Sequence, residues 1–435
     1  MSLYGALTTA VSGLTAQAKS LGNISDNVAN SQTIGFKRVD TSFVNYLTVS
    51  TQRIHAPGSV VARPDYTNAQ QGTIEQVESH LALGIAGQGF FAVSRTDGEA
   101  AGLPTFDDQI FYTRAGDFTM DENGYLVNGS GYFLRGWAMD ANGNVDRTRT
   151  QELRITDTLF NPVATSEITV SANLPSDLAV AGPTQNSEIP IYDTLGTLRM
   201  VQFGWTKLAD NTWRLEVSVP DDIAAASRGT VNVLFGDAAT TGVADGTIGD
   251  FATATGTLTP SVFAGGAAST VSFVTDFGNG PQTVTLNLGT FGTSDGVTQF
   301  SGTEYQVRTQ SQNGVPLGSF SSLSFRDNGD VVINYDNGQT RSVARVPVVT
   351  FNDPDRLQRQ DGQAFTRTLE SGDAKVLDTN NNGAGKVVVS SLERSNVDIA
   401  AEFTKLIVAQ RAYTANTKVV TASDEMLQDT LNMRR

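Results

Sequence analysis

The side chains best suited to holding a metal ion lie in two oxygen-rich turns. The first turn matches positions 1, 3, 5 and 6 of a calcium-binding loop with Asp378, Asn380, Asn382 and Gly383. The position that should supply a bidentate glutamate is Val389. The second turn has suitably spaced oxygen side chains but lacks the glycine and the closing glutamate. Such clusters are ordinary turn chemistry, so we expect turns at Asp378–Gly383 and Asp140–Asp146, with weak calcium binding as the open alternative.

Motifs for catalysis are weak or missing. The two histidines, His55 and His80, do not form an H-E-x-x-H motif, and the chain has no cysteine to act as a nucleophile or metal ligand. Residues 87–92 fit the G-x-G-x-x-A pattern of a dinucleotide site, but they lead into an aromatic strand where that site needs a helix. Residues 384–387 lack the upstream glycine and the Ser or Thr of a phosphate-binding loop. We therefore predict no catalytic residue and no cofactor, and we do not expect an enzyme.

The composition excludes several classes of partner. The 435 residues carry a formal net charge of −15 at pH 7, and residues 229–307 contain no lysine or arginine. Nucleic acids and anionic membranes both reward basic patches, so we predict no nucleic-acid partner. No stretch approaches the ~20 apolar residues of a membrane span, so we expect no membrane insertion. The start of the chain lacks a secretory signal pattern, which predicts a cytoplasmic protein or export without a cleaved signal peptide.

Heptad patterns at both ends of the chain predict two long helices. Near the N-terminus, positions step alternately by four and three through Leu3, Leu7, Ala10, Leu14, Gln17, Leu21, Ile24 and Val28. Near the C-terminus, the same pattern runs through Ile399, Phe403, Leu406, Gln410, Tyr413, Thr417, Val420, Asp424, Leu427 and Leu431. A repeat near 3.5 residues leaves a narrow seam for packing against another helix. We predict helices over about 2–30 and 396–435, with other copies of the chain as partners and an intramolecular hairpin as the alternative.

Three asparagines lie beside the first seam. Asn23, Asn27 and Asn30 are spaced by four and three, so they form a polar stripe along the predicted helix. Asparagine is a poor helix former but a good lateral hydrogen-bond partner. The stripe therefore suggests lateral contacts, with a solvated helix face as the alternative.

β-structure fills the region between the two predicted helices. Short strands separated by Asn-Gly or Gly-rich turns indicate antiparallel hairpins over 72–149 and again over 316–371. We predict that these two segments form one inner β-domain. Residues 150–315, which are rich in Thr, Val, Gly, Ala and Ser, predict a second all-β domain inserted into the first.

The remaining segments complete a nested organisation. Residues 31–71, with breakers such as Pro57 and Pro64, are expected to form an extended connector together with 372–395. Residues 1–30 with 396–435 are expected to form a terminal helical, coiled-coil-like polymerisation domain. The predicted fold class is therefore mostly β with long terminal α-helices, in which a terminal helical domain is combined with two antiparallel β-domains.

Both ends of the chain resemble the bacterial flagellar rod and hook proteins. The N-terminal signature is Ile24–Ser31 followed by Gly35, Phe36 and Lys37. The C-terminal signature is carried by Ser395–Ile399, Ile407–Asn416 and Asp424–Leu427. The blocks at 87–93 and 111–136 are similar to the inner β-domain of that family.

The resemblance implies a structural function. Members of this family polymerise into a helical tube whose inner layers are the terminal helices, and they are exported unfolded through the flagellar type III export apparatus. A chain with an insertion as long as 150–315 resembles the hook members of the family, which form a flexible coupling that transmits torque between rod and filament. A distal rod or hook–filament junction protein is the nearest alternative. The implied location is the extracellular hook of the flagellum, and the implied partners are further copies of the chain and the rod, hook-cap and hook–filament junction proteins.

The heptads and the resemblance together predict the residues of the subunit interface. They are Leu3, Leu7, Leu14, Leu21, Ile24, Asn27, Val28, Asn30, Phe403, Leu406, Ile407, Tyr413, Val420, Leu427 and Leu431. A rival hypothesis from another class is a secreted β-rich glycan-binding module with a terminal helical hairpin. That rival predicts a monomer that binds a glycan.

Overall fold

The computed structural model describes residues 3–50, 55–140, 143–156, 159–238, 242–302 and 304–433. The chain divides into two compact units. The first unit comprises Met1–Thr156, Ser322–Asn334 and Thr340–Arg435, and the second comprises Asp157–Ser321 and Tyr335–Gln339. The predicted insertion at 150–315 lies largely within the second unit.

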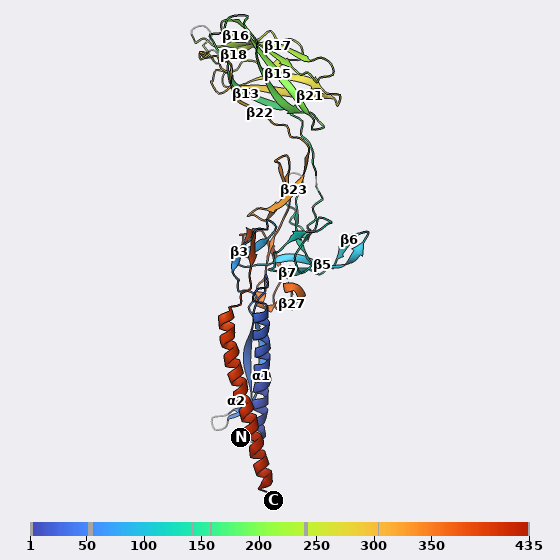
Figure 1. Cartoon of the computed structure of the whole chain (residues 1–435), viewed down its shortest axis with the longest axis vertical. Coiled ribbons are helices and arrows are strands. Elements are labelled where there is room, and N and C mark those ends of the chain that lie inside the picture. The colour runs from blue at the N-terminus through green and yellow to red at the C-terminus, as the bar shows by residue number, and fades with distance from the viewer. Residues whose placement is uncertain are drawn as a thin grey trace. The chain divides into compact units, whose positions relative to one another are not determined.

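The two long helices belong to the first unit and lie side by side (Figure 1, blue and red). Helix α1 spans Leu3–Ala29 and helix α2 spans Ile399–Asn432, so the predicted terminal helices are confirmed. The N-terminus of α2 is capped by Asp398, whose Oδ1 accepts hydrogen bonds from the backbone N–H groups of Ala400 and Ala401. After α1 the chain turns at Gly35, where φ is +68° and a Cβ would lie only 2.5 Å from the backbone nitrogen of Ala115.

A long β-hairpin follows α1. Strands β1 (Val39–Ser50) and β2 (His55–Tyr66) pair antiparallel and lie against α1. The Thr9 hydroxyl donates to the Gly58 carbonyl over 2.9 Å, and the Val60 N–H donates to Ser12 Oγ over 3.1 Å. The sequence predicted an extended connector here because of its prolines, but the structure has a paired hairpin. Proline is compatible with this hairpin, because each strand of a two-stranded sheet has one edge that pairs with no other strand.

The main sheet of the first unit is formed by segments from both sides of the insertion. Its strand order is β23-β24-β25-β10-β5-β7-β28-β27, and β6, β8, β9 and β11 are attached beside this path. The bounds are β5 (Phe91–Ala100), β6 (Leu103–Phe106), β7 (Phe111–Thr113), β8 (Thr119–Met120), β9 (Leu126–Val127), β10 (Tyr132–Ala138), β11 (Gln151–Glu152), β23 (Gly318–Phe325), β24 (Asp330–Tyr335), β25 (Thr340–Arg345), β27 (Gln358–Gln360) and β28 (Ala364–Thr366). The hairpin turns predicted at Asp121–Gly124 and Asn128–Gly131 are confirmed, since they join β8 to β9 and β9 to β10.

An aromatic cluster and short strand pairs hold this unit together. The rings of Phe351 and Phe365 meet that of Phe90 edge to face at centroid distances of 6.0 and 5.5 Å. Residues 372–395 also form short strands, and so differ from the expected connector. The pairs are β3 (Ile74–Gln76) with β31 (Ser391–Glu393), β4 (Leu83–Ala86) with β30 (Lys386–Val389), and β26 (Val348–Thr350) with β29 (Lys375–Leu377). Two short 3-10 helices, η1 (Pro354–Arg356) and η2 (Asp361–Gln363), flank β27.

The second unit contains two five-stranded sheets around one hydrophobic core. The sheet orders are β19-β20-β21-β13-β22 and β14-β15-β16-β17-β18. Buried residues alternate with half-buried ones along β15 and mostly with exposed ones along β16. The core includes Phe203, Trp205 and Trp213 from one sheet and Phe273 from the other. The bounds of these ten strands are β13 (Glu167–Asn173), β14 (Gln185–Tyr192), β15 (Leu198–Ala209), β16 (Thr212–Ser218), β17 (Ser227–Phe235), β18 (Ile248–Ala252), β19 (Thr259–Pro260), β20 (Ala268–Asp276), β21 (Pro281–Thr290) and β22 (Gln306–Gln312). The unit also contains the short strand β12 (Leu159–Phe160), which pairs with β23.

Candidate assembly surface on the terminal helices

The two terminal helices contact each other through small and polar side chains. The buried positions of α1 are Ala10, Ala16, Ser20, Ile24 and Asn27, and those of α2 are Glu402, Ala409 and Ser423. Gly13 permits a close approach, because a Cβ there would lie 2.9 Å from the side-chain nitrogen of Asn416. The inward row of α2 thus passes through residues 402, 409, 416 and 423, which are spaced by seven as in a heptad repeat.

The seam predicted for α2 is displaced from this inward row. In one half of the ten predicted positions, Phe403, Gln410, Thr417 and Asp424 are exposed, and the side chain of Leu431 lies outside the described residues. The other half includes Leu406, Val420 and Leu427, which are half-buried, and Ile399 and Tyr413, which are exposed. The predicted seam of α2 therefore does not face α1, and its contact with other copies of the chain stays a prediction.

The predicted interface residues therefore fall into three groups. Three have exposed side chains: Phe403, Ile407 and Tyr413. Eight are half-buried: Leu7, Leu14, Leu21, Val28, Asn30, Leu406, Val420 and Leu427. Two are buried within the chain, Ile24 and Asn27, so they offer almost no surface to a second copy. The side chains of the remaining two, Leu3 and Leu431, lie outside the described residues.

An exposed row on α2 was not anticipated from the sequence. It consists of Val408, Ala415, Val419, Ala422 and Met426, all of which are exposed, and we call it the α2 row. Its spacing of seven, four, three and four residues keeps these side chains on one helix face. The spacing of this row can be read from the sequence, but the predicted seam has the same kind of spacing. Periodicity therefore did not distinguish the two, because α2 carries apolar residues on more than one face. On α1, Tyr4 and Val11 are also exposed, and they are seven residues apart.

Asn27 connects three elements. Its Nδ2 donates to the carbonyl of Val39 over 2.9 Å and to Glu402 Oε2 over 3.0 Å, while its Oδ1 accepts from the Val39 N–H over 2.9 Å. Asn23 likewise donates to Thr41 on β1, whereas Asn30 bonds to Asp26 on α1 itself, so two of the three asparagines make lateral contacts inside the subunit. In the single chain, the hydrogen-bonding groups of Asn27 are therefore used inside the subunit, between α1, α2 and β1.

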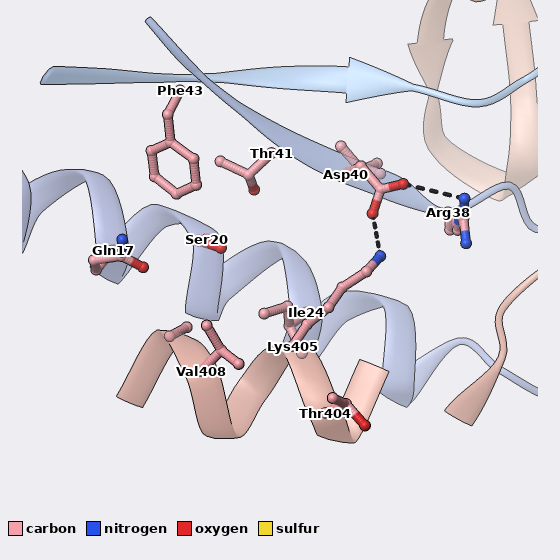
Figure 2. A pocket seen from close by; sticks show the side chains of 12 residues that line it. Gln17, Ser20, Ile24, Arg38, Asp40, Thr41, Phe43, Thr404, Lys405 and Val408 are labelled. Atoms are coloured by element: carbon pink, nitrogen blue, oxygen red, sulfur yellow. Dashed lines mark hydrogen bonds and ion pairs between the residues drawn. The ribbon is translucent and has the colours of Figure 1, made fainter. Parts of the chain in front are cut away.

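A groove of about 570 Å³ opens between α1, β1 and α2. Figure 2 shows Phe43 on β1 facing the groove from one side and Val408 on α2 from the other. The remaining lining residues are Gln17, Ser20, Ile24, Arg38, Val39, Asp40, Thr41, Thr404, Lys405 and Ala409. The groove is thus apolar at Phe43, Val408 and Ile24 and polar along one wall.

The charges of the polar wall are paired with one another. Lys405 Nζ lies 2.5 Å from Asp40 Oδ1 and 2.7 Å from Glu402 Oε1, and Arg38 lies 3.2 Å from Asp40 (Figure 2). Partial burial lowers the pKa of Lys405, but the hydrogen bonds to Asp40 and Glu402 outweigh burial and raise the pKa above its ordinary value. Lys405 is therefore a fixed cation that ties α2 to β1.

A buried ion cluster joins the helical end of the first unit to its β-structure. Glu393 accepts from Lys37 Nζ over 2.5 Å and from Arg114 Nη1 over 2.7 Å, and all three side chains are at most 1% exposed. The Gly72 N–H donates to the same carboxylate, and Lys37 Nζ also donates to the Gln70 carbonyl. Burial, opposed by the Glu393 charge, lowers the pKa of Lys37 to about 8. Burial raises the pKa of Glu393, but Arg114 and Lys37 outweigh it and lower that pKa.

The two oxygen-rich turns use their carboxylates internally. Asp378 is paired with Arg147 at 3.1 Å and with Arg345 at 3.3 Å, and Asp140 accepts hydrogen bonds from the backbone and side chain of Asn144. Asn142 lies outside the described residues. Across the described segments, no group of three or more His, Cys, Asp or Glu side chains is placed to hold a metal ion. In the same segments, neither helix is long and apolar enough to cross a membrane.

Four models of flagellar protein families match successive segments of the chain. They are described as flagella basal body rod protein (residues 7–37), flagellar hook protein FlgE/F/G D1 domain (84–174), flagellar basal body protein FlaE D2 domain (140–315) and flagellar basal body rod FlgEFG protein C-terminal (389–433). The two terminal models cover most of α1 and all of α2. The α2 row and most of α1 therefore lie within segments that match models of rod-protein ends.

Curated relatives match the chain from end to end. The flagellar hook protein FlgE of Brucella abortus biovar 1 is 32% identical over 100% of both chains, and that of Rhizobium meliloti is 30% identical over the same share. The hook protein of Escherichia coli is 26% identical over 99% of this chain and 100% of its own. The solved structure of the Helicobacter pylori flagellar hook protein FlgE2 covers 73% of this chain and 100% of its own, with 14% identity and a TM-score of 0.45. The chain belongs to the flagellar hook protein family and is a structural subunit of the bacterial flagellar hook.

Proposed function

We propose that this subunit polymerises into a flexible helical tube in which exposed apolar residues of α1 and α2 contact neighbouring copies. The observation that carries the proposal is the α2 row, an uncharged apolar stripe that faces solvent in the single chain. A helix that is apolar on more than one face is stable in water when each apolar face is covered. Membership of a self-polymerising family supports further copies of the chain as the cover.

The proposed interface differs in part from the one expected from the sequence. We keep the exposed residues Phe403, Ile407 and Tyr413, the half-buried seam residues, and Leu3 and Leu431 as candidates. We add Tyr4, Val11 and the α2 row, which the sequence pattern did not single out. We remove Ile24 and Asn27, which are buried within the subunit. Full burial of one large apolar side chain contributes roughly 1.5–3 kcal/mol, so a few such contacts per subunit stabilise a polymer.

The proposed interface also assigns a role to each domain. In our proposal, residues 1–30 and 396–435 form the polymerisation domain and the β1–β2 hairpin braces it. Residues 72–149 with 316–371 form the inner β-domain, and 150–315 form the outer domain. An outer surface without lysine or arginine over 229–307 suits small, reversible contacts, which a tube needs if it is to bend while transmitting torque from rod to filament.

The partners follow from the same assignment. We propose that the ends of the polymer contact rod proteins, hook-cap proteins and hook–filament junction proteins. We also propose that the chain leaves the cell through the flagellar type III export apparatus, without a cleaved signal peptide, and functions outside the cell. The family is a structural one, and we propose no enzymatic activity and no cofactor for this member.

The test is assembly of the purified full-length chain. After the chain is concentrated, negative-stain microscopy should show tubes, and sedimentation should show a polymer in equilibrium with monomer above a threshold concentration. A chain that remains monomeric at high concentration and binds a glycan array would contradict the proposal and favour the glycan-binding module. Leu369→Asp serves as a control variant, because it places a new charge at a fully exposed position outside the helices. This variant should assemble like the wild type.

A further inference from the structure

We propose that the groove between α1, β1 and α2 binds the C-terminal turns of α2 from a second copy of the chain, with Met426 and Met433 as the inserted side chains. This inference rests on the proposed function, since it requires that copies assemble. It adds to that function the identity of two surfaces that meet.

The chemistry of the groove favours an apolar occupant. Phe43 and Val408 stand at its mouth with 45% and 62% of their surface exposed, although both are large apolar residues. Ile24 and Ala409 lie deeper and are buried. The cation Lys405 is already paired with Asp40 and Glu402. A charged ligand would have to displace these pairs, whereas an apolar side chain would cover Phe43 and Val408 and leave the pairs intact.

The far end of α2 provides a suitable occupant. Asn27 lies beside Glu402 and Gly13 lies beside Asn416, so the same antiparallel register sets Leu3 level with Met426. The last turns of α2 continue past the start of α1 (Figure 1). Met426 is 51% exposed and Met433 is 86% exposed there. Methionine is flexible and polarizable, which suits insertion into an irregular apolar groove.

The groove and the C-terminal end of α2 are two different surfaces that can meet only between copies, as an open polymer requires. Val408 at the groove and Met426 lie on the same helix about 30 Å apart at the rise of an α-helix. A straight helix cannot return its own end to its own groove, so the contact must be made between copies. A contact between two different patches is heterologous, and such contacts generate helical filaments when they do not close into a ring. Val408 in the groove and Met426 at the helix end both belong to the α2 row, which joins the two patches along one apolar helix face.

The absence of cysteine in the chain permits a direct test. The double variant Phe43→Cys/Met433→Cys is assembled and treated with a short bismaleimide crosslinker, and the products are separated under denaturing conditions. We expect a ladder of dimers, trimers and longer species, because each copy links to the next. The matched variant Leu369→Cys/Met433→Cys has an exposed cysteine outside the groove and should give no ladder above the background of the unassembled chain.

The outcomes separate this inference from the proposed function. If tubes form and Phe43→Cys/Met433→Cys gives no ladder, the inference is overturned and the proposed function stands. If the wild-type chain forms no tubes, the proposed function fails, and the inference fails with it. A second pair, Val408→Cys/Met426→Cys, replaces a smaller and more exposed groove residue than Phe43 and should give the same ladder, so a folding defect of the first pair cannot decide the result. A ladder from the Leu369 pair equal to that of the groove pairs would also overturn the inference.

Discussion

The side-chain nitrogen of Asn27 donates a hydrogen bond to Glu402 Oε2 over 3.0 Å, and both side chains are fully buried. The bond joins helices that are 375 residues apart in the sequence. Asn27 also satisfies both backbone groups of Val39, and Glu402 holds Lys405. One asparagine thus fixes the position of α1 relative to α2 and to the β1–β2 hairpin.

Asn27→Ala should destabilise the helical end of the first unit. The substitution leaves the N–H and carbonyl of Val39 without their partner and removes one donor from a buried carboxylate. Buried groups that lose their partners cost about 1–3 kcal/mol, and more when a charge is involved, so we expect a loss of about 2–3 kcal/mol in the free energy of unfolding. Urea unfolding followed by far-UV circular dichroism of the helices measures this loss. Asn30→Ala is the control and should change the value by less than about 0.5 kcal/mol, since the bonds of Asn30 to Asp26 are exposed. Equal effects of the two substitutions would contradict the role assigned to Asn27.

Lys37 predicts a specific pH dependence of stability. Burial lowers its pKa to about 8 in the folded chain from an ordinary value of 10.5. Between these two pH values the unfolded chain holds the proton and the folded chain has released it, so this group makes the free energy of unfolding rise with pH. From pH 7.5 to 10 the rise should be about 2 kcal/mol at 1.36 kcal/mol per pKa unit.

Lys37→Met provides the measurement for that dependence. The difference in unfolding free energy between wild type and variant should change with pH by the amount given above, whereas other titrating groups cancel in the difference. Glu393 has the opposite linkage: because its pKa is lowered in the folded chain, its stabilising contribution is present at neutral pH and is lost as the pH falls through its ordinary and then its folded pKa. A pH-independent difference between wild type and Lys37→Met over the alkaline range would refute the assignment.

The second unit should unfold as a cooperative unit of its own. Trp213 is completely buried in the core between its two sheets, and Trp→Ala substitutions in cores cost about 3–5 kcal/mol. We expect Trp213→Ala to lower the temperature of one calorimetric transition and to leave another, assigned to the first unit, in place. Val262→Ala, at an 87% exposed position in the same unit, should shift neither. A single transition that moves as a whole with Trp213→Ala would show that the units unfold together.

The sequence predicted the helices and β-domains well because their signals are local. The heptads at both ends and the glycine turns at 121–124 and 128–131 each specify structure within a few residues. The sequence did not predict which face of α2 meets α1, because apolar residues such as Phe403, Ile407 and Val408 lie on different faces and periodicity alone does not choose between them. The β1–β2 hairpin was missed because its prolines indicate breaks, although a two-stranded sheet tolerates them.

The polar interactions that position the helices have no local signal. Lys37 meets Glu393 across 356 positions, and Arg114 meets it across 279. Nothing near Lys37 in the sequence indicates that its side chain is buried. The spacing of the asparagines predicted either lateral contacts or solvent exposure for Asn27, but it did not indicate a partner. Its partners Val39 and Glu402 come together only after the chain has folded.

The most direct test of the central claim is the concentration at which the chain begins to sediment as a polymer, measured for Val419→Asp and for the wild type. Val419 lies in the middle of the α2 row, is 45% exposed and is not one of the buried positions of α2. If this row is covered by neighbouring copies, a buried carboxylate should raise the threshold at least about tenfold, which corresponds to 1.4 kcal/mol. The Leu369→Asp control should leave the threshold unchanged. Polymerisation of Val419→Asp at the wild-type threshold would contradict the claim that the α2 row holds the subunits together.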